Sequence, residues 1–186
     1  MAKTFSPSQA KGRPSTAGLV GTVEPGVTGL TVEEFGSGDG QNRVTKFTFT
    51  NFTITNTDAA GAGSYGSQKL YDFPTGSLAL KNGYASFTSS SSSTNLSGTV
   101  KFSLGTAAEA TGDTLDSTQA NAVVSTSTTA GSSTPGKGYG AAPSIVNGTG
   151  TAADLYLNMG ASASDSAGAA TVTVNGYAIV EWSVLA

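Results

Sequence analysis

Few residues in this chain could take part in catalysis, and the carboxylates are the main candidates. The 186 residues include neither His nor Cys. The usual general base, the thiol nucleophile and the soft metal ligands are therefore missing. Among the carboxylates, Glu33 and Glu34 are adjacent in a segment with strand character. Neighbouring side chains of a strand point to opposite faces, so these two cannot face each other as an acid and a base. We interpret both as edge or surface residues.

Two further patterns also have structural interpretations. Asp113 and Asp116 lie in a Gly- and Thr-rich turn before a candidate helix over 117–123, where Asp commonly accepts hydrogen bonds from backbone N–H groups. We favour this capping role over a calcium site. The stretch from Gly36 to Gly40 resembles a phosphate-binding loop, but neither Lys-Ser nor Lys-Thr follows it, and a hairpin tip is favoured. The sequence thus predicts no enzymatic activity, no cofactor and no metal.

The elements around these residues must be built from a composition that is poor in charge. Charged residues make up 11% of the chain, against roughly 25% in ordinary domains. Polarity comes instead from 25 Ser, 27 Thr and the backbone of 25 Gly. Such a composition is typical of short strands joined by many turns.

Alternation of apolar and polar residues with period two predicts where those strands lie and which side chains are buried. The clearest runs are 96–104 and 171–184, and further strands are expected at 30–35, 69–73, 77–80, 84–88 and 153–159. Seven or eight short antiparallel strands predict an all-β sandwich or barrel. Its predicted core includes Val100, Phe102, Leu104, Val172, Val174, Val180 and Trp182.

Irregularities interrupt this pattern. Between Phe49 and Phe52 the apolar parity switches, which predicts a bulge near Thr50-Asn51. Asn175-Gly176 is compatible with either a hairpin turn or a bulge. Turns are expected at Lys81-Asn82-Gly83, and long loops at Ser89 to Ser93 and over 125–144.

The first part of the chain has a different character. Residues 1–26 hold three of the six prolines and show no apolar period, so we expect an extended N-terminal arm, followed by a sandwich domain over 27–186. The arm carries Lys3, Lys11 and Arg13 before any acid, and the remainder holds 6 basic and 12 acidic residues. These three cations are candidates for contact with an acidic protein surface, because they form too weak a basic footprint for nucleic acid.

Neither a signal-peptide core nor an apolar run of membrane-spanning length is visible in the sequence. We therefore expect synthesis in a cytoplasm and no membrane partner.

Several phrases of the sequence carry a family resemblance. They are Leu30-Thr-Val-Glu-Glu-Phe-Gly-Ser-Gly, Thr48-Phe-Thr-Asn-Phe-Thr-Ile-Thr, Lys69-Leu-Tyr-Asp-Phe-Pro-Thr-Gly and Val174-Asn-Gly-Tyr-Ala-Ile-Val-Glu-Trp. In this order they resemble small virion proteins of tailed phages, particularly marine and cyanobacterial ones. The resemblance covers roughly residues 30–184 and implies a capsid decoration (cement) protein with a jelly-roll fold, commonly oligomeric on the shell.

This resemblance sets the functional expectation. We expect a structural protein on the capsid surface that binds the major capsid protein and stabilises the shell. The charge-poor surface predicts self-association into a homo-oligomer, most simply a trimer. The alternative is a host-surface or carbohydrate-binding module of a fibre or capsid, in which Tyr65, Tyr71, Tyr139 and Tyr156 would stack on sugar rings. The number of copies per virion would separate these two expectations.

Overall fold

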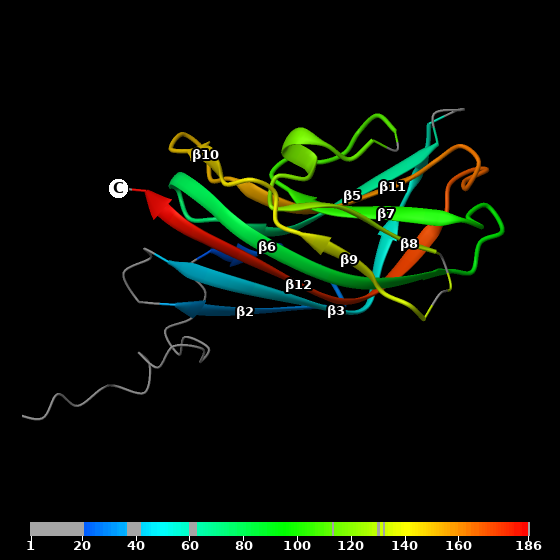
Figure 1. Cartoon of the computed structure of the whole chain (residues 1–186), viewed down its shortest axis with the longest axis horizontal. Helices are drawn as coiled ribbons and strands as arrows, with labels where there is room; N and C mark the ends of the chain where they lie inside the picture. The colour runs from blue at the N-terminus through cyan, green and yellow to red at the C-terminus, as the bar shows by residue number, and fades with distance from the viewer. Residues whose placement is uncertain are drawn as a thin grey trace, which may run out of the picture.

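The computed structural model describes residues 21–36, 42–59, 63–112, 114–129, 131 and 133–185. Within these residues the chain forms two antiparallel sheets of six strands each, packed face to face (Figure 1). The predicted all-β antiparallel sandwich is confirmed.

Sheet A has β12 (Thr171–Leu185) at its centre, between β6 (Gly76–Ser91) and β3 (Arg43–Thr55). On one side β3 pairs with β2 (Leu30–Gly36), and on the other β6 pairs with β10 (Ser144–Gly148) and β9 (Gly136–Tyr139). Sheet B runs in the order β1 (Thr22–Val23), β5 (Ser64–Asp72), β11 (Asp154–Ala161), β7 (Thr99–Gly105) and β8 (Val123–Thr129), with β4 (Thr57–Asp58) also paired to β5.

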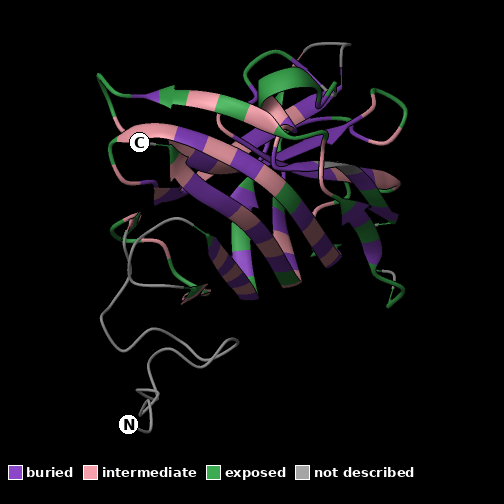
Figure 2. Ribbon diagram, turned by 60° about the vertical axis from the view of Figure 1, so that its left-hand side comes forward, coloured by how far each residue is buried: buried purple, intermediate pink, exposed green. Residues whose placement is uncertain are grey.

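The core lies between the sheets, where the inward residues of both meet. Burial alternates along the strands, so that buried and more exposed residues follow each other as stripes on the ribbons (Figure 2). All seven side chains that the alternation assigns to the core are 0% exposed. They are Val100, Phe102, Leu104, Val172, Val174, Val180 and Trp182. The indole of Trp182 packs edge-on against Phe73 and donates from Nε1 to Thr45 Oγ1 at 2.8 Å, which satisfies its one polar group.

The predicted bulge at Thr50-Asn51 is also confirmed. The register between β3 and β12 shifts there, and Asn51 adopts a positive φ of 50°. Its N–H donates to Asn175 Oδ1 at 2.7 Å. The extra residue lets both apolar pairs of β3, Phe47 with Phe49 and Phe52 with Ile54, reach the core despite the switch in parity. Asn175-Gly176 opposite it belongs to a continuous strand rather than a hairpin.

The turn predicted at Lys81-Asn82-Gly83 is wrong. These residues lie inside β6, which runs unbroken over sixteen residues. The register between β6 and β12 shifts beside Lys81, so the residues whose types favour a turn form a β-bulge instead. The predicted loop at Ser89 to Ser93 is partly wrong for the same reason, since β6 continues to Ser91. Pairing along the length of β12 outweighs the local preference for a turn.

Two other local predictions fail. The helix expected over 117–123 is reduced to a 3₁₀-helix, η2 (Ser117–Gln119), with no side-chain cap from Asp116, and Val123 begins β8. The long loop expected over 125–144 contains most of β8 and all of β9. Ser- and Thr-rich segments give a weak apolar alternation, and only pairing with β7 and β6 makes them strands.

One part of the predicted arm belongs to the sandwich. Residues 22–23 form β1 and pair with β5 in sheet B. The rest of the arm, with Lys3, Lys11 and Arg13, lies outside the described residues. No helix in the described part of the chain is long and apolar enough to cross a membrane.

The outer face of sheet B is partly covered by the segment 106–121. Asn158, 0% exposed on β11, holds this segment down. Its Nδ2 donates to the carbonyl oxygens of Ala107 at 3.0 Å and Gln119 at 2.9 Å, and its Oδ1 accepts from Glu109 N–H at 2.9 Å and from Ser67 Oγ at 2.5 Å.

Candidate functional site

Three tyrosines form a contiguous group on the outer face of sheet A, which we call the tyrosine platform. Tyr139 on β9 is the direct cross-strand partner of Tyr84 on β6, and their ring centroids are 5.7 Å apart. The ring of Tyr177 on β12 lies 5.8 Å from that of Tyr84. Tyr139 is 63% exposed and Tyr177 37% exposed, large values for aromatic side chains. The platform therefore offers ring surface to a ligand.

Alternation explains why these rings point outward. Tyr84 precedes the buried Ala85, and Tyr177 precedes the buried Ala178, so each tyrosine has the parity opposite to the core. Among the platform residues, the sequence analysis singled out only Tyr139. The parity of the other two was readable from the sequence, but their adjacency depends on the strand order β9, β6, β12.

The surroundings of the platform are mixed. Ile179 of β12 is the cross-strand partner of Tyr84 on one side and of Lys46 on the other, and Lys46 Nζ forms an ion pair with Glu33 Oε2 at 3.3 Å. Lys137 of β9 is the cross-strand partner of Ser86 of β6. Partial desolvation and the neighbouring Tyr84 raise the pKa of Tyr177, so its ring stays neutral at physiological pH.

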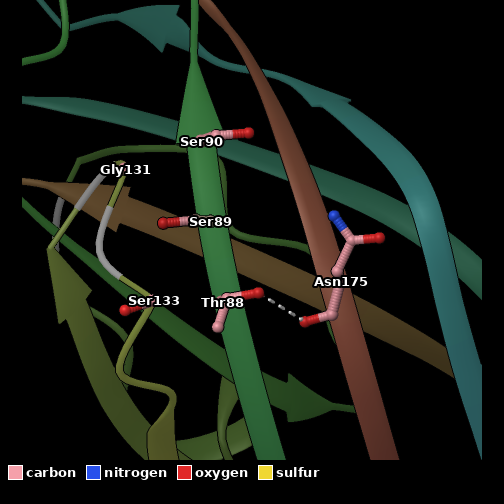
Figure 3. Close-up of a pocket in the computed structure, with 6 residues that line it drawn as sticks. All are labelled: Thr88, Ser89, Ser90, Gly131, Ser133 and Asn175. Atoms are coloured by element: carbon pink, nitrogen blue, oxygen red, sulfur yellow. Dashed lines mark hydrogen bonds between the residues drawn. The ribbon is translucent and has the colours of Figure 1, made fainter.

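A shallow hollow lies beside the platform, and one of its lining residues, Asn175, is two residues before Tyr177 on β12 (Figure 3). It has a volume of about 360 Å³ and is lined by Thr88, Ser89, Ser90, Gly131, Ser133 and Asn175. Thr88 Oγ1 donates to the carbonyl oxygen of Asn175 at 3.4 Å. The Oγ of Ser89 is buried and has no hydrogen-bond partner among the described residues. The hollow is thus lined by hydroxyl, amide and backbone groups.

A group of charged residues lies at the edge of sheet B, around Lys69. Its Nζ is 2.6 Å from Asp72, 3.2 Å from Asp154 and 3.3 Å from Glu24. The hydrogen bond with Asp72 is the largest of the interactions that raise the pKa of Lys69, so it stays protonated. Burial raises the pKa of Asp72, while hydrogen bonds outweigh burial at Asp154 and lower its pKa. This network joins the segment after β1 to β5 and β11.

Next to this network, a buried polar group lies between the two sheets. Tyr71 of β5 donates its hydroxyl to Glu34 of β2, and its Oη accepts from Gly21 N–H at 2.8 Å. Arg43 Nη1 is 3.7 Å from Glu34 Oε2, too far for a hydrogen bond but within ion-pair range. Burial, followed by the Glu34 carboxylate, raises the pKa of Tyr71.

The residues proposed from the sequence are placed as follows. Glu33 and Glu34 do point to opposite faces, but only Glu33 is a surface residue. Glu34 is buried, where it accepts a hydrogen bond from Tyr71 and forms an ion pair with Arg43. Tyr71 is also fully buried and cannot stack on a ligand. Tyr65 and Tyr156 lie on sheet B, away from the platform.

Other proposed residues lie outside the described part of the chain. They are Lys3, Lys11, Arg13, Asp113 and residues 37–40. Among the described residues, no group of three or more His, Cys, Asp or Glu side chains could hold a metal ion.

Comparison with known proteins adds no family. No protein-family model matches the chain, and no curated protein matches it.

Proposed function

We propose that this chain is a non-enzymatic structural protein of a tailed-phage virion, which decorates the outer surface of the capsid, binds the major capsid protein and stabilises the shell. The resemblance of residues 30–184 to phage decoration proteins supports this function. The structural observation that supports it is the attachment to the sandwich of residues 21–24, which follow the basic N-terminal segment in the sequence. A fixed base restricts how far the body can move relative to a docked arm.

That base is fixed by several independent contacts. Gly21 N–H donates to Tyr71 Oη, β1 pairs with β5, and Glu24 N–H donates to Leu70 O at 3.0 Å. A Cβ at position 21 would lie 2.2 Å from Asp72 O and 2.3 Å from the Tyr71 ring, so only glycine fits there. The three cations Lys3, Lys11 and Arg13 precede this point, and we propose that they dock on acidic surface of neighbouring capsid subunits.

We further infer a jelly-roll topology for the sandwich. Taken in chain order, β3, β5 and β6 alternate between sheets A and B, as do β11 and β12. The strand orders are β3-β12-β6 with β9 and β10 in one sheet and β5-β11-β7-β8 in the other, and they support this proposal of two Greek keys wrapped together.

We propose that the protein acts as a homo-oligomer, most simply a trimer. The edge strand β10 presents Ile145, which is 74% exposed, and the nearby end of β12 presents Leu185. Exposed apolar side chains along an edge strand favour contact between copies. Light scattering of the purified protein measures this directly, and a monomer at high concentration would contradict it.

The test of decoration is reconstitution on capsids that lack the protein. Deleting residues 2–20 should leave a folded sandwich, since the described contacts begin at residue 21. The truncated protein should bind capsids more weakly and protect them less against heat. Binding of the full chain should weaken with salt, because exposed ion pairs are screened over roughly 10 Å at 0.1 M.

The matched control separates arm charge from charge in general. Replacing Lys3, Lys11 and Arg13 by Gln should reproduce most of the deletion, whereas Lys81→Gln on the sandwich should bind like the wild type. Equal affinity of all forms at every salt concentration would show that the arm does not anchor. Absence of binding by the full chain, or only a few copies per virion, would contradict the decoration function itself.

A further inference from the structure

The chain contains three Asn-Gly pairs, and the structure places them in different surroundings. They are Asn82-Gly83 in β6, Asn147-Gly148 in β10 and Asn175-Gly176 in β12. Because glycine has no side chain, the backbone nitrogen that follows such an asparagine can approach the asparagine carboxamide with little steric hindrance. An Asn-Gly pair is therefore a place where the chain can react with itself.

At Asn82 the two groups that would react are already hydrogen-bonded to each other. Gly83 N–H donates to Asn82 Oδ1 at 2.9 Å, and Asn82 is exposed to water. A C=O bond is about 1.23 Å long, so Gly83 N is at most roughly 4.1 Å from the carboxamide carbon Cγ. Only a small motion separates this arrangement from the near-attack distance of about 3–3.5 Å.

The carboxamides of the other two pairs are bonded elsewhere. Asn147 Oδ1 accepts from the N–H of Thr149 at 3.1 Å and from its hydroxyl at 2.7 Å. Asn175 Oδ1 accepts from Asn51 N–H at 2.7 Å. Turning either carboxamide toward the glycine that follows it strains or breaks these hydrogen bonds, which opposes the reaction.

The backbone around Asn82 has room to adjust. β10 pairs with residues 76–80 of β6 and β9 pairs with residues 84–87, so residues 81–83 pair with neither strand. On the other side of β6 the register to β12 shifts beside Lys81, and such a bulge disrupts the ladder locally. The glycine itself is required by packing, because a Cβ at position 83 would lie 2.3 Å from Ala122 O.

We propose that Asn82 is a site of spontaneous modification in the folded protein, where it converts to aspartate and isoaspartate. Gly83 N attacks Asn82 Cγ and forms the new N–C bond of a succinimide ring, while the bond from Cγ to Nδ2 breaks. Solvent carries the proton of Gly83 N to Nδ2, which leaves as ammonia. Water then opens the ring at one of its two carbonyl carbons, which gives aspartate or isoaspartate at this position.

The product places a new negative charge opposite an existing one. Glu181 is the cross-strand partner of Asn82, and it lies between the buried Val180 and Trp182, so its side chain points outward. Like charges directly opposite each other on neighbouring strands are destabilising. The modification should therefore lower the stability of the sandwich as the protein ages, whatever the protein binds.

The test is incubation of the full-length protein in water labelled with heavy oxygen, at mildly alkaline pH, followed by peptide mass spectrometry at intervals. The label enters only when water opens the ring during the incubation, so modification before the experiment is excluded. In the folded protein Asn82 should be modified about ten-fold faster than Asn147 or Asn175, because its reacting groups are already in place. In protein unfolded by guanidinium chloride, the three pairs should react at similar rates.

Variants separate the reaction from its consequence. Asn82→Ser should abolish modification at this position and leave the rates at Asn147 and Asn175 unchanged. Asn82→Asp, which reproduces one product, should lower the thermal midpoint, and the drop should be smaller when Glu181→Gln is also present. The matched control is Asn147→Asp, which should lower the midpoint less, because the cross-strand partner of Asn147 is the uncharged Ser77.

Two results would overturn the assignment. One is modification of Asn147 or Asn175 in the folded protein at a rate equal to or above that of Asn82. The other is the same ratio of the three rates in folded and unfolded protein, because the fold would then have no part in the selection. A drop in midpoint for Asn82→Asp that is unchanged by Glu181→Gln would overturn the proposed effect on stability. The assay of capsid binding is independent of all these measurements.

Discussion

Asn158 should be important for the covered face of sheet B, because its buried side chain makes three of the hydrogen bonds that hold the segment 106–121 against the sheet. Replacing it by Ala removes three hydrogen bonds to this segment, to Ala107 O, Gln119 O and Glu109 N–H. At about 1 kcal/mol each, their loss should lower the free energy of unfolding by about 3 kcal/mol. For a chain of this size that corresponds to a drop of roughly 6–12 °C in the thermal midpoint.

The position of the damage is more diagnostic than its size. Hydrogen exchange should accelerate first at the amides of Glu109, Ala110 and Thr111. Their N–H groups are hydrogen-bonded in the segment that Asn158 holds against the sheet. Exchange in the central strand β12 should change only as far as global stability does. Asn158→Asp should be at least as harmful at neutral pH, because a carboxylate would face two carbonyl oxygens. Lowering the pH should partly restore it, since the protonated carboxyl can donate to one of them.

The control is Asn147→Ala, the same chemical change at an exposed position of β10, where the Asn147 side chain bonds only to Thr149 among the described residues. It should cost less than about 1 kcal/mol. A midpoint for Asn158→Ala within a degree of wild type would refute the anchoring role. So would exchange that rises uniformly across both sheets, because the segment would then have no separate attachment.

Three further predictions concern the core and the base of the arm. Trp182→Ala should cost about 3–5 kcal/mol in urea unfolding, since the ring is 0% exposed and leaves a cavity; a loss below about 1 kcal/mol would contradict its place in the core. The raised pKa of Tyr71 means that its stabilising contribution is intact below its ordinary pKa of 10.0 and is lost as the pH rises above it. Stability should therefore fall above pH 10 by up to about 1.4 kcal/mol per pH unit more in the wild type than in Tyr71→Phe, and parallel curves would refute this. Lys69→Met should cost about 1 kcal/mol in low salt and less in about 1 M salt, where the ion pairs of this partly exposed network are screened; an equal cost at both salt concentrations would show that the network is not electrostatic.

The fold class and the core could be read from the sequence because they depend on local alternation. A strand turns successive side chains to opposite faces, so the parity of Phe102 or Val180 settles its burial without knowledge of its neighbours. The switch in parity at Asn51 predicted a bulge by the same reasoning. Where alternation is weak, as in the Ser- and Thr-rich residues of β8, the prediction failed.

The candidate site depended on distant pairing instead. Tyr84 and Tyr177 are 93 positions apart in the chain, and their contact exists only because β6 pairs with β12 in one register. Burial of Glu34 likewise depends on Tyr71 from the opposite sheet. Local sequence determines which face a side chain takes, because backbone geometry alone imposes it. Which side chains then share that face is decided by strand order and register, which the core selects only when the whole sandwich forms.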